Sequence, residues 1–247
     1  MRSVIRCLKA EFLKCRHSAL LYIHVVVPAL GAVIFASYFK ISGWDAATKI
    51  SAYLEALAIA LPFLIGIIVG TVTQSEYQAG HYQLILGTIP SRLAAYVGKL
   101  GVLFIGFMGA VTLALGIFYS LYQTGSYTLY LRAGGLLALT AFPIYMIYLF
   151  IGMNFGKGAS MGMGIAGSLV TALMITGMGD AVWKYIPWAW GARFMDYMVL
   201  AWNRPALFQQ MKSEFMSGIW ITVICAGSLL IASLAWFRYW EGGKEND

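Results

Sequence analysis

Charged residues are scarce in this chain of 247 residues, since Asp, Glu, Lys and Arg together make up only 11% of it. Globular proteins carry about 25% charged residues, and a soluble domain of this length could not cover its surface with so few. Hydrophobic residues account for 60% of the chain. This composition argues against a disordered chain and against a soluble enzyme, and it predicts a polytopic membrane protein.

Cysteine and histidine are also rare, and neither predicts a metal site. The spacings of Cys7, Cys15 and Cys225 fit neither a disulfide framework nor a zinc site. His17 and His24 lie seven residues apart, but no acid or cysteine completes a ligand set. We therefore expect this chain to bind no metal and no cofactor.

Acidic residues are fewer than basic ones, and the formal net charge is +7. In a membrane protein such an excess indicates orientation rather than nucleic-acid binding, because Lys and Arg gather on the cytoplasmic side. Before the first apolar segment, one acid (Glu11) is outnumbered by five basic residues: Arg2, Arg6, Lys9, Lys14 and Arg16. We expect a multi-pass protein of a bacterial cell membrane with both termini in the cytoplasm and no nucleic-acid partner.

Long apolar segments are plentiful. A helix needs about 20 apolar residues to cross a bilayer, and six segments qualify: 19–39, 53–72, 100–122, 134–151, 159–178 and 218–237. We expect one all-α membrane domain over residues 1–247, with six transmembrane helices. Residues 1–17 are expected to form an amphipathic cytoplasmic helix, residues 73–99 a cytoplasmic segment, and residues 179–217 an outer loop.

The first of these flanking segments has helical periodicity. Val4, Leu8 and Phe12 recur every four residues, and the basic residues lie mostly off that stripe. The pattern predicts a helix lying on the inner membrane surface. A basic anchor that only sets the topology explains the charges equally well, and the two interpretations are compatible.

The second flanking segment is the most polar stretch between two spans. It is apolar on one side and ends at Gly87 and Pro90, which predicts a short helix lying under the membrane. Such a helix could contact a cytosolic partner. The alternative is a loop that only joins two spans.

The third flanking segment is rich in aromatic residues, among them Trp183, Tyr185, Trp188 and Trp190. Tryptophan favours the membrane–water interface, so an aromatic belt is the simpler interpretation. Because unstructured loops of about 40 residues are uncommon, a lid or re-entrant hairpin over a transport path is the alternative.

Buried carboxylates are nearly absent from the apolar segments, where Glu55 lies near an outer end. Ion-driven carriers usually carry such groups at mid-membrane. Their scarcity argues against an ion-driven pump and favours a protein whose energy comes from a partner.

Two sequence patterns point weakly to chemistry on the chain itself. Residues 152–158 lack the spacing and the Ser or Thr of an ATP-binding P-loop. Residues 177–180 spell the Gly-x-Gly-Asp pattern of intramembrane aspartyl proteases, which need two carboxylates sharing a proton. No second Asp lies mid-span, so a protease using Asp180 is kept only as an alternative.

Two stretches resemble the ABC-2 permease family, and the resemblance extends over essentially the whole chain. Residues 8–14, which include Glu11 and Lys14, are similar to the helix that opens that family. The second stretch shares the spacing of a family pattern, and its residues are Glu76, Gly80, Leu84, Leu86, Pro90, Arg92 and Lys99. The resemblance implies a non-catalytic permease with the fold of type V exporters.

The same resemblance implies partners and a mechanism. Two copies of a cytosolic ABC ATPase would bind ATP and Mg, and a second permease subunit would complete a homo- or heterodimer. ATPase closure would push on residues 76–86 and on the N-terminal helix. Glu76 is expected to anchor this coupling segment, and Gly80 is expected to permit close approach of a neighbouring element.

Within the family, residues 183–188 resemble the permeases of lantibiotic immunity. This narrower resemblance implies export of a lantibiotic or similar antimicrobial peptide, with Trp183, Tyr185, Trp188 and Trp190 at the substrate or outer gate. Another hydrophobic substrate is the alternative.

Overall fold

The computed structural model describes residues 2–16, 20–83 and 91–242, and the described part of the chain is helical, without strands. The elements, in chain order, are α1 (Arg2–Arg16), α2 (Leu20–Ile41), α3 (Ala46–Gln78), α5 (Arg92–Tyr122), α6 (Tyr127–Ile175), the 3-10 turns η1 (Gly177–Gly179) and η2 (Trp183–Tyr185), α7 (Pro187–Asn203) and α8 (Pro205–Tyr239). Five of these helices are long and apolar enough to cross a membrane: α2, α3, α5, α6 and α8.

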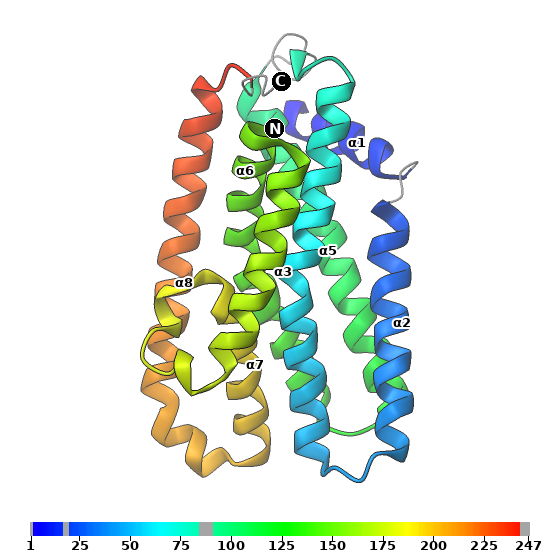
Figure 1. The fold of residues 1–247 in the computed structure, drawn as a ribbon, viewed down its shortest axis with the longest axis vertical. Helices are drawn as coiled ribbons and strands as arrows, with labels where there is room; N and C mark the ends of the chain where they lie inside the picture. The colour runs from blue at the N-terminus through cyan, green and yellow to red at the C-terminus, as the bar shows by residue number, and fades with distance from the viewer. Residues whose placement is uncertain (1, 17–19, 84–90, 243–247) are drawn as a thin grey trace.

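Helix α6 is not one straight rod, although it spans 49 residues. Gly156 interrupts it with a positive φ of 83°, a conformation that glycine adopts without steric cost. The Tyr148 hydroxyl donates a hydrogen bond of 3.0 Å to the Met163 carbonyl, whereas fifteen residues of continuous helix would extend about 22 Å. Helix α6 therefore doubles back at Gly156 into two limbs, residues 127–155 and 157–175 (Figure 1).

The centre of the molecule is the packing of α3 against both limbs of α6. A Cβ atom on Gly66 would lie 2.7 Å from the Ser160 carbonyl oxygen and 2.9 Å from the Cα atom of Gly164. The absence of side chains at both glycines thus lets the two backbones touch, as in other small-residue contacts between membrane helices.

Ser168 completes this contact at a proline. Pro62 lies inside α3 and cannot donate a backbone hydrogen bond. The Ser168 hydroxyl accepts from the Phe63 amide at 3.1 Å and donates to the Ile59 carbonyl at 2.7 Å. The backbone groups beside the proline are thereby satisfied within the protein, as a lipid environment requires.

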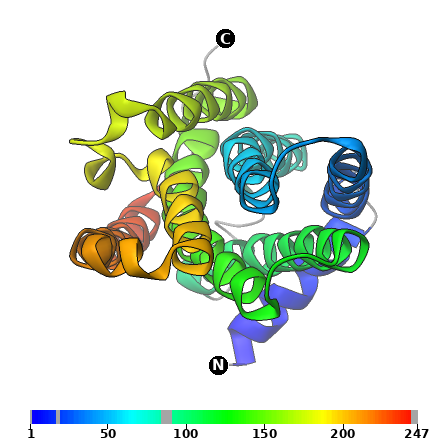
Figure 2. The same ribbon diagram turned by 90° about the horizontal axis from the view of Figure 1, so that it is seen from below.

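Helix α2 lies at the edge of the bundle. Seen along the helices, it packs mainly beside α5 (Figure 2), and its Phe35 ring meets Tyr53 of α3. Of its most apolar 18 residues 17% are buried, compared with 67% for α6. Among the described residues, a large apolar face of α2 is therefore exposed.

Helix α1 lies across the ends of the long helices, at the end of the molecule where α8 finishes (Figure 1). It crosses α5 closely, because a Cβ atom on Gly98 would lie only 2.8 Å from the Cys7 Cβ atom. We refer to this end as the α1 end.

Residues 179–217, expected from the sequence to form a loop, are mostly helical. They contain η2, α7 and the first thirteen residues of α8. Helix α7 packs against α3 and α6 through a face that includes Ala189, Phe194 and Met195, all fully buried. Helical packing thus removes most of the exposed backbone that a long loop would carry.

Candidate functional site

Four charged side chains meet where α1, α3 and α5 come together. Glu11 and Lys14 lie one turn apart on α1, so they share a face. Glu76 lies in the last turn of α3, and Lys99 lies in the third turn of α5. The close crossing of α1 at Gly98 brings these elements within reach of one another.

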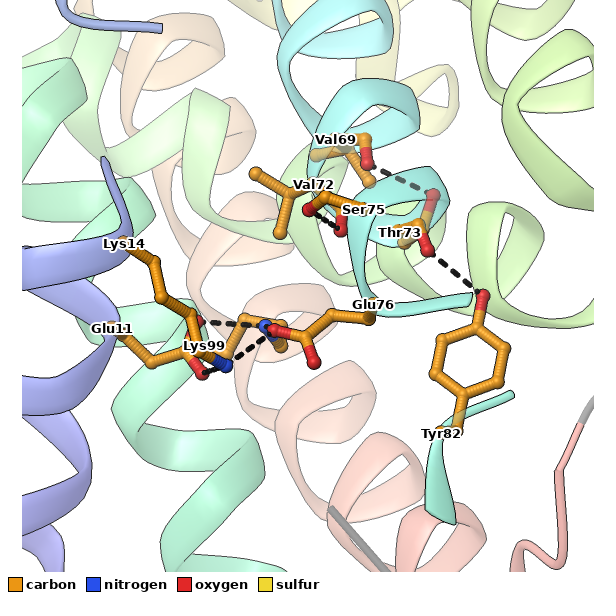
Figure 3. Close-up of polar contacts among 9 residues, drawn as sticks. All are labelled: Glu11, Lys14, Val69, Val72, Thr73, Ser75, Glu76, Tyr82 and Lys99. Atoms are coloured by element: carbon orange, nitrogen blue, oxygen red, sulfur yellow. Dashed lines mark hydrogen bonds and ion pairs between the residues drawn. The ribbon is translucent and has the colours of Figure 1, made fainter. Parts of the chain in front are cut away.

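The four charges alternate in sign around a ring (Figure 3). Lys99 Nζ lies 2.7 Å from Glu11 Oε2 and 2.8 Å from Glu76 Oε1. Lys14 Nζ lies 2.7 Å from Glu76 Oε1 and 3.1 Å from Glu11 Oε1. Each carboxylate therefore contacts both ammonium groups, and the formal charge of the cluster is zero.

Three members of the cluster are withdrawn from solvent. Lys99 is 2% exposed, Glu76 5% and Glu11 9%. Buried charges are tolerated when they are paired, but removal of one partner leaves an uncompensated charge that costs about 3–5 kcal/mol. The cluster therefore holds α1, α3 and α5 together as a unit.

Lys14 lies at the solvent side of the cluster. Partial burial acts to lower its pKa, but the hydrogen bonds and negative charges of Glu76 and Glu11 outweigh burial, so the pKa is raised above 10.5. Lys14 therefore stays protonated at physiological pH and keeps the ring neutral.

The chain turns sharply just beyond Glu76. Gly80, His81 and Tyr82 all have positive φ, of 127°, 50° and 64°. The Tyr82 hydroxyl donates to the Thr73 carbonyl at 3.2 Å, which folds the turn back onto α3 (Figure 3). The segment after Glu76 is thus a tight turn whose shape is set by backbone conformation.

The turn changes two expectations about the coupling segment. Residues 74–78 belong to α3 rather than to a separate short helix. Gly80 is required by its positive φ and not by close approach to a described element, since among the described residues a Cβ atom there would meet nothing within 4 Å. Leu84, Leu86 and Pro90 lie outside the described residues.

Arg92 ties the same end of the molecule to α8. Its Nη1 donates a hydrogen bond of 3.1 Å to the Trp240 carbonyl, just after the last residue of α8. The Trp240 ring packs edge-on against Tyr82 with centroids 5.0 Å apart. The turn, α5 and the end of α8 are therefore in contact beside the charged cluster.

The aromatic residues predicted at the outer gate are mostly packed inside the chain. Trp183 and Trp190 are each 1% exposed, and their Nε1 atoms donate to Glu214 at 3.2 Å and to the Lys184 carbonyl at 2.8 Å. Trp188 Nε1 donates to the Tyr148 hydroxyl at 3.0 Å. Tyr185, by contrast, is 74% exposed. Of these four side chains, Tyr185 offers the largest surface to a ligand.

Asp180 is engaged in an ion pair rather than in a pair of carboxyl groups. Its Oδ1 lies 2.7 Å from Arg193 Nη2, and the same nitrogen donates to the Thr176 carbonyl at 2.8 Å. Arg193 thus covers the end of α6 and holds Asp180 beside it. This geometry favours a structural role for Asp180 over protease chemistry.

Two features of the molecule were not assigned a role from sequence. Lys99 lies at the centre of the cluster. Its place in the residue pattern that resembles the family was the one sequence feature that pointed to it. Asp196 on α7 forms a side-chain hydrogen bond with Glu55 on α3, a contact that no local spacing reveals. In the part of the chain that the structure describes, no group of three His, Cys, Asp or Glu residues could hold a metal ion.

Comparison with known protein families gives a match over much of the chain. Residues 7–172 match the family described as ABC-2 family transporter protein. The match covers two thirds of the chain and includes all four members of the charged cluster. No curated protein matches the sequence.

Proposed function

The chain belongs to the ABC-2 family of transporter proteins, and from this premise we propose that it exports an antimicrobial peptide. Family membership makes it a multi-pass membrane permease that works with an ABC ATPase. The peptide, a lantibiotic or a similar amphipathic molecule, is our narrower proposal. An ABC-2 permease for another hydrophobic substrate is the second candidate.

In the proposed topology the chain crosses the membrane six times. The two limbs of α6 count as separate crossings because the chain reverses at Gly156. Helices α2, α3, α5 and α8 supply the other four. An even number of crossings agrees with α1 and the end of α8 lying at one end of the molecule (Figure 1). The basic α1 favours a cytoplasmic position for that end and an interfacial position for α1 itself.

The charged cluster is the observation that carries the coupling mechanism. We infer that two ATPase copies contact the α1 end, where Gln78, Ala79 and His81 of the turn are exposed beside α1. Because buried Lys99 forms ion pairs with both Glu11 and Glu76, a push on either segment reaches both α3 and α5. The ATP and Mg²⁺ that drive the movement belong to the partner.

A second permease subunit completes the proposed transporter. The weakly buried face of α2 is an apolar surface that a homologous subunit or lipid would cover. Substrate would leave at the opposite end, where Tyr185 is exposed. An aromatic ring there could contact the cationic side chains of a peptide.

The coupling proposal is tested with the permease–ATPase complex in proteoliposomes. Glu76→Gln leaves buried Lys99 with one carboxylate fewer, and we expect peptide-stimulated ATP hydrolysis to fall at least tenfold while the complex still assembles. A variant that inverts all four charges (Glu11→Lys, Lys14→Glu, Glu76→Lys, Lys99→Glu) keeps the alternation and should recover much of the stimulation.

Asp45→Asn is the matched control, because Asp45 is an exposed carboxylate at the opposite end of α3. It should leave stimulation unchanged. Full stimulation in Glu76→Gln would refute the coupling role, whereas normal coupling without any response to peptide would refute only the substrate.

A further inference from the structure

A cavity lined by two cations lies at the end of the molecule opposite α1. This open cavity of about 420 Å³ is bordered by the first turns of α6 and α8 and by α7. Its walls are largely apolar and include Phe208 and Phe215. Two cations, Arg132 and Lys212, complete the lining, and among its described lining residues none is acidic. We refer to it as the Arg132–Lys212 cavity.

The carboxylates nearest along the chain are engaged elsewhere. Glu214, two residues after Lys212, faces η2, where it accepts from Trp183 and lies 3.4 Å from Lys184 Nζ. Asp196, two residues before the lining residue Met198, bonds with Glu55 of α3. Within the described part of the chain, the two cations therefore have no carboxylate partner.

Both cations lie where the apolar segments begin. Arg132 precedes the apolar segment 134–151 by two residues, and Lys212 precedes the segment 218–237 by six. At 1.5 Å per residue, these offsets place them about 3 and about 9 Å outside the apolar stretches. This is the level of lipid headgroups, to which long basic side chains extend.

We propose that the Arg132–Lys212 cavity binds the headgroup phosphate of an anionic phospholipid in the leaflet opposite α1. The two cations supply charge complementarity to the phosphate, and the apolar walls suit the glycerol and upper acyl region. Basic pockets between membrane helices bind lipid headgroups by this combination. The site is distinct from the charged cluster, which lies at the other end of the molecule.

The proposal is tested by native mass spectrometry of the permease in mixed micelles with equal amounts of phosphatidylglycerol and phosphatidylcholine of the same chain length. The wild-type chain should retain phosphatidylglycerol preferentially. Each lost cation should reduce that preference about fivefold. The double variant Arg132→Gln, Lys212→Gln should therefore retain the two lipids almost equally, and the single variants should be intermediate.

Lys40→Gln is the matched control, because Lys40 is an exposed cation at the same end of the molecule and outside the cavity. It should keep the wild-type preference. A double variant that prefers phosphatidylglycerol as strongly as the wild type does would overturn the proposal. Displacement of phosphatidylglycerol by millimolar inorganic phosphate would also overturn it, because the two cations would then bind a free anion rather than a lipid headgroup. If the double variant does not fold, the two single variants decide in the same way.

Discussion

At the scale of single residues, the buried charges are informative because nearby opposite charges must offset the free-energy cost of burying them. Lys99 is almost fully buried and contacts two carboxylates from two other helices. The sequence indicated Glu11, Lys14 and Glu76 as site residues, but Lys99 and Glu11 lie 88 positions apart in the chain. Periodicity describes only neighbours within one helix, so it could not predict which buried charges meet.

The carboxyl group of Asp196 predicts how the stability of the folded chain depends on pH. Burial raises the pKa of its carboxyl group and Glu55 raises it further, to about 8, although Arg193 partly opposes the shift. In the unfolded chain the group ionises near pH 3.8. Between these values the folded state holds the proton that the unfolded state has lost, so stability should fall as pH rises toward 8.

The measurement is the thermal unfolding midpoint of the purified permease between pH 6 and pH 8.5. Asp196→Asn removes the titrating group and should flatten this part of the profile. Asp45→Asn is the control, because hydrogen bonds from Thr48 lower the pKa of Asp45 and keep its titration below this window. An unchanged slope in Asp196→Asn would contradict the assignment.

At the scale of elements, the contact between α3 and α6 depends on glycine. A Cβ atom at Gly66 would overlap the backbone at Ser160 and Gly164, and backbone cannot move aside as a flexible side chain can. Gly66→Ala should therefore destabilise the permease by about 1–3 kcal/mol, the usual range for overpacking. Gly109→Ala on α5 is the matched control, since nothing lies within 4 Å of its Cβ position.

The thermal unfolding midpoint in detergent micelles distinguishes the two glycine variants. Gly66→Ala should lower the midpoint, whereas Gly109→Ala should leave it unchanged or raise it slightly, because alanine favours helix. A Gly66→Ala variant as stable as the wild type would show that α3 and α6 do not touch at this point.

Elements were predictable from sequence where one apolar run corresponds to one helix. The segments at 53–72, 100–122 and 218–237 each lie within a single helix of the structure, and so do residues 20–39 of the first segment. Residues 179–217 were not predictable, because the polar and aromatic composition of that segment resembles a loop. Its helices depend on burial of Trp183 and Trp190 against distant residues, and local pattern carries no information about such contacts.

At the scale of the whole molecule, topology depends on the reversal within α6. If α6 crossed once, five crossings would place the two termini on opposite sides of the membrane. In the proposed topology the reversal at Gly156 adds a crossing, which agrees with α1 and the end of α8 lying together. The side on which each terminus lies therefore decides between the two topologies.

Single-cysteine labelling in intact cells measures this directly. In a background without Cys7, Cys15 and Cys225, the variants Lys9→Cys and Glu241→Cys place an exposed thiol near each terminus. An impermeant maleimide should label neither until the membrane is permeabilised, because the proposed topology, based on the basic α1, places both termini in the cytoplasm. Tyr185→Cys, which replaces an exposed side chain of the predicted outer loop, should be labelled in intact cells. Labelling of one terminus alone would establish an odd number of crossings and refute the six-crossing topology.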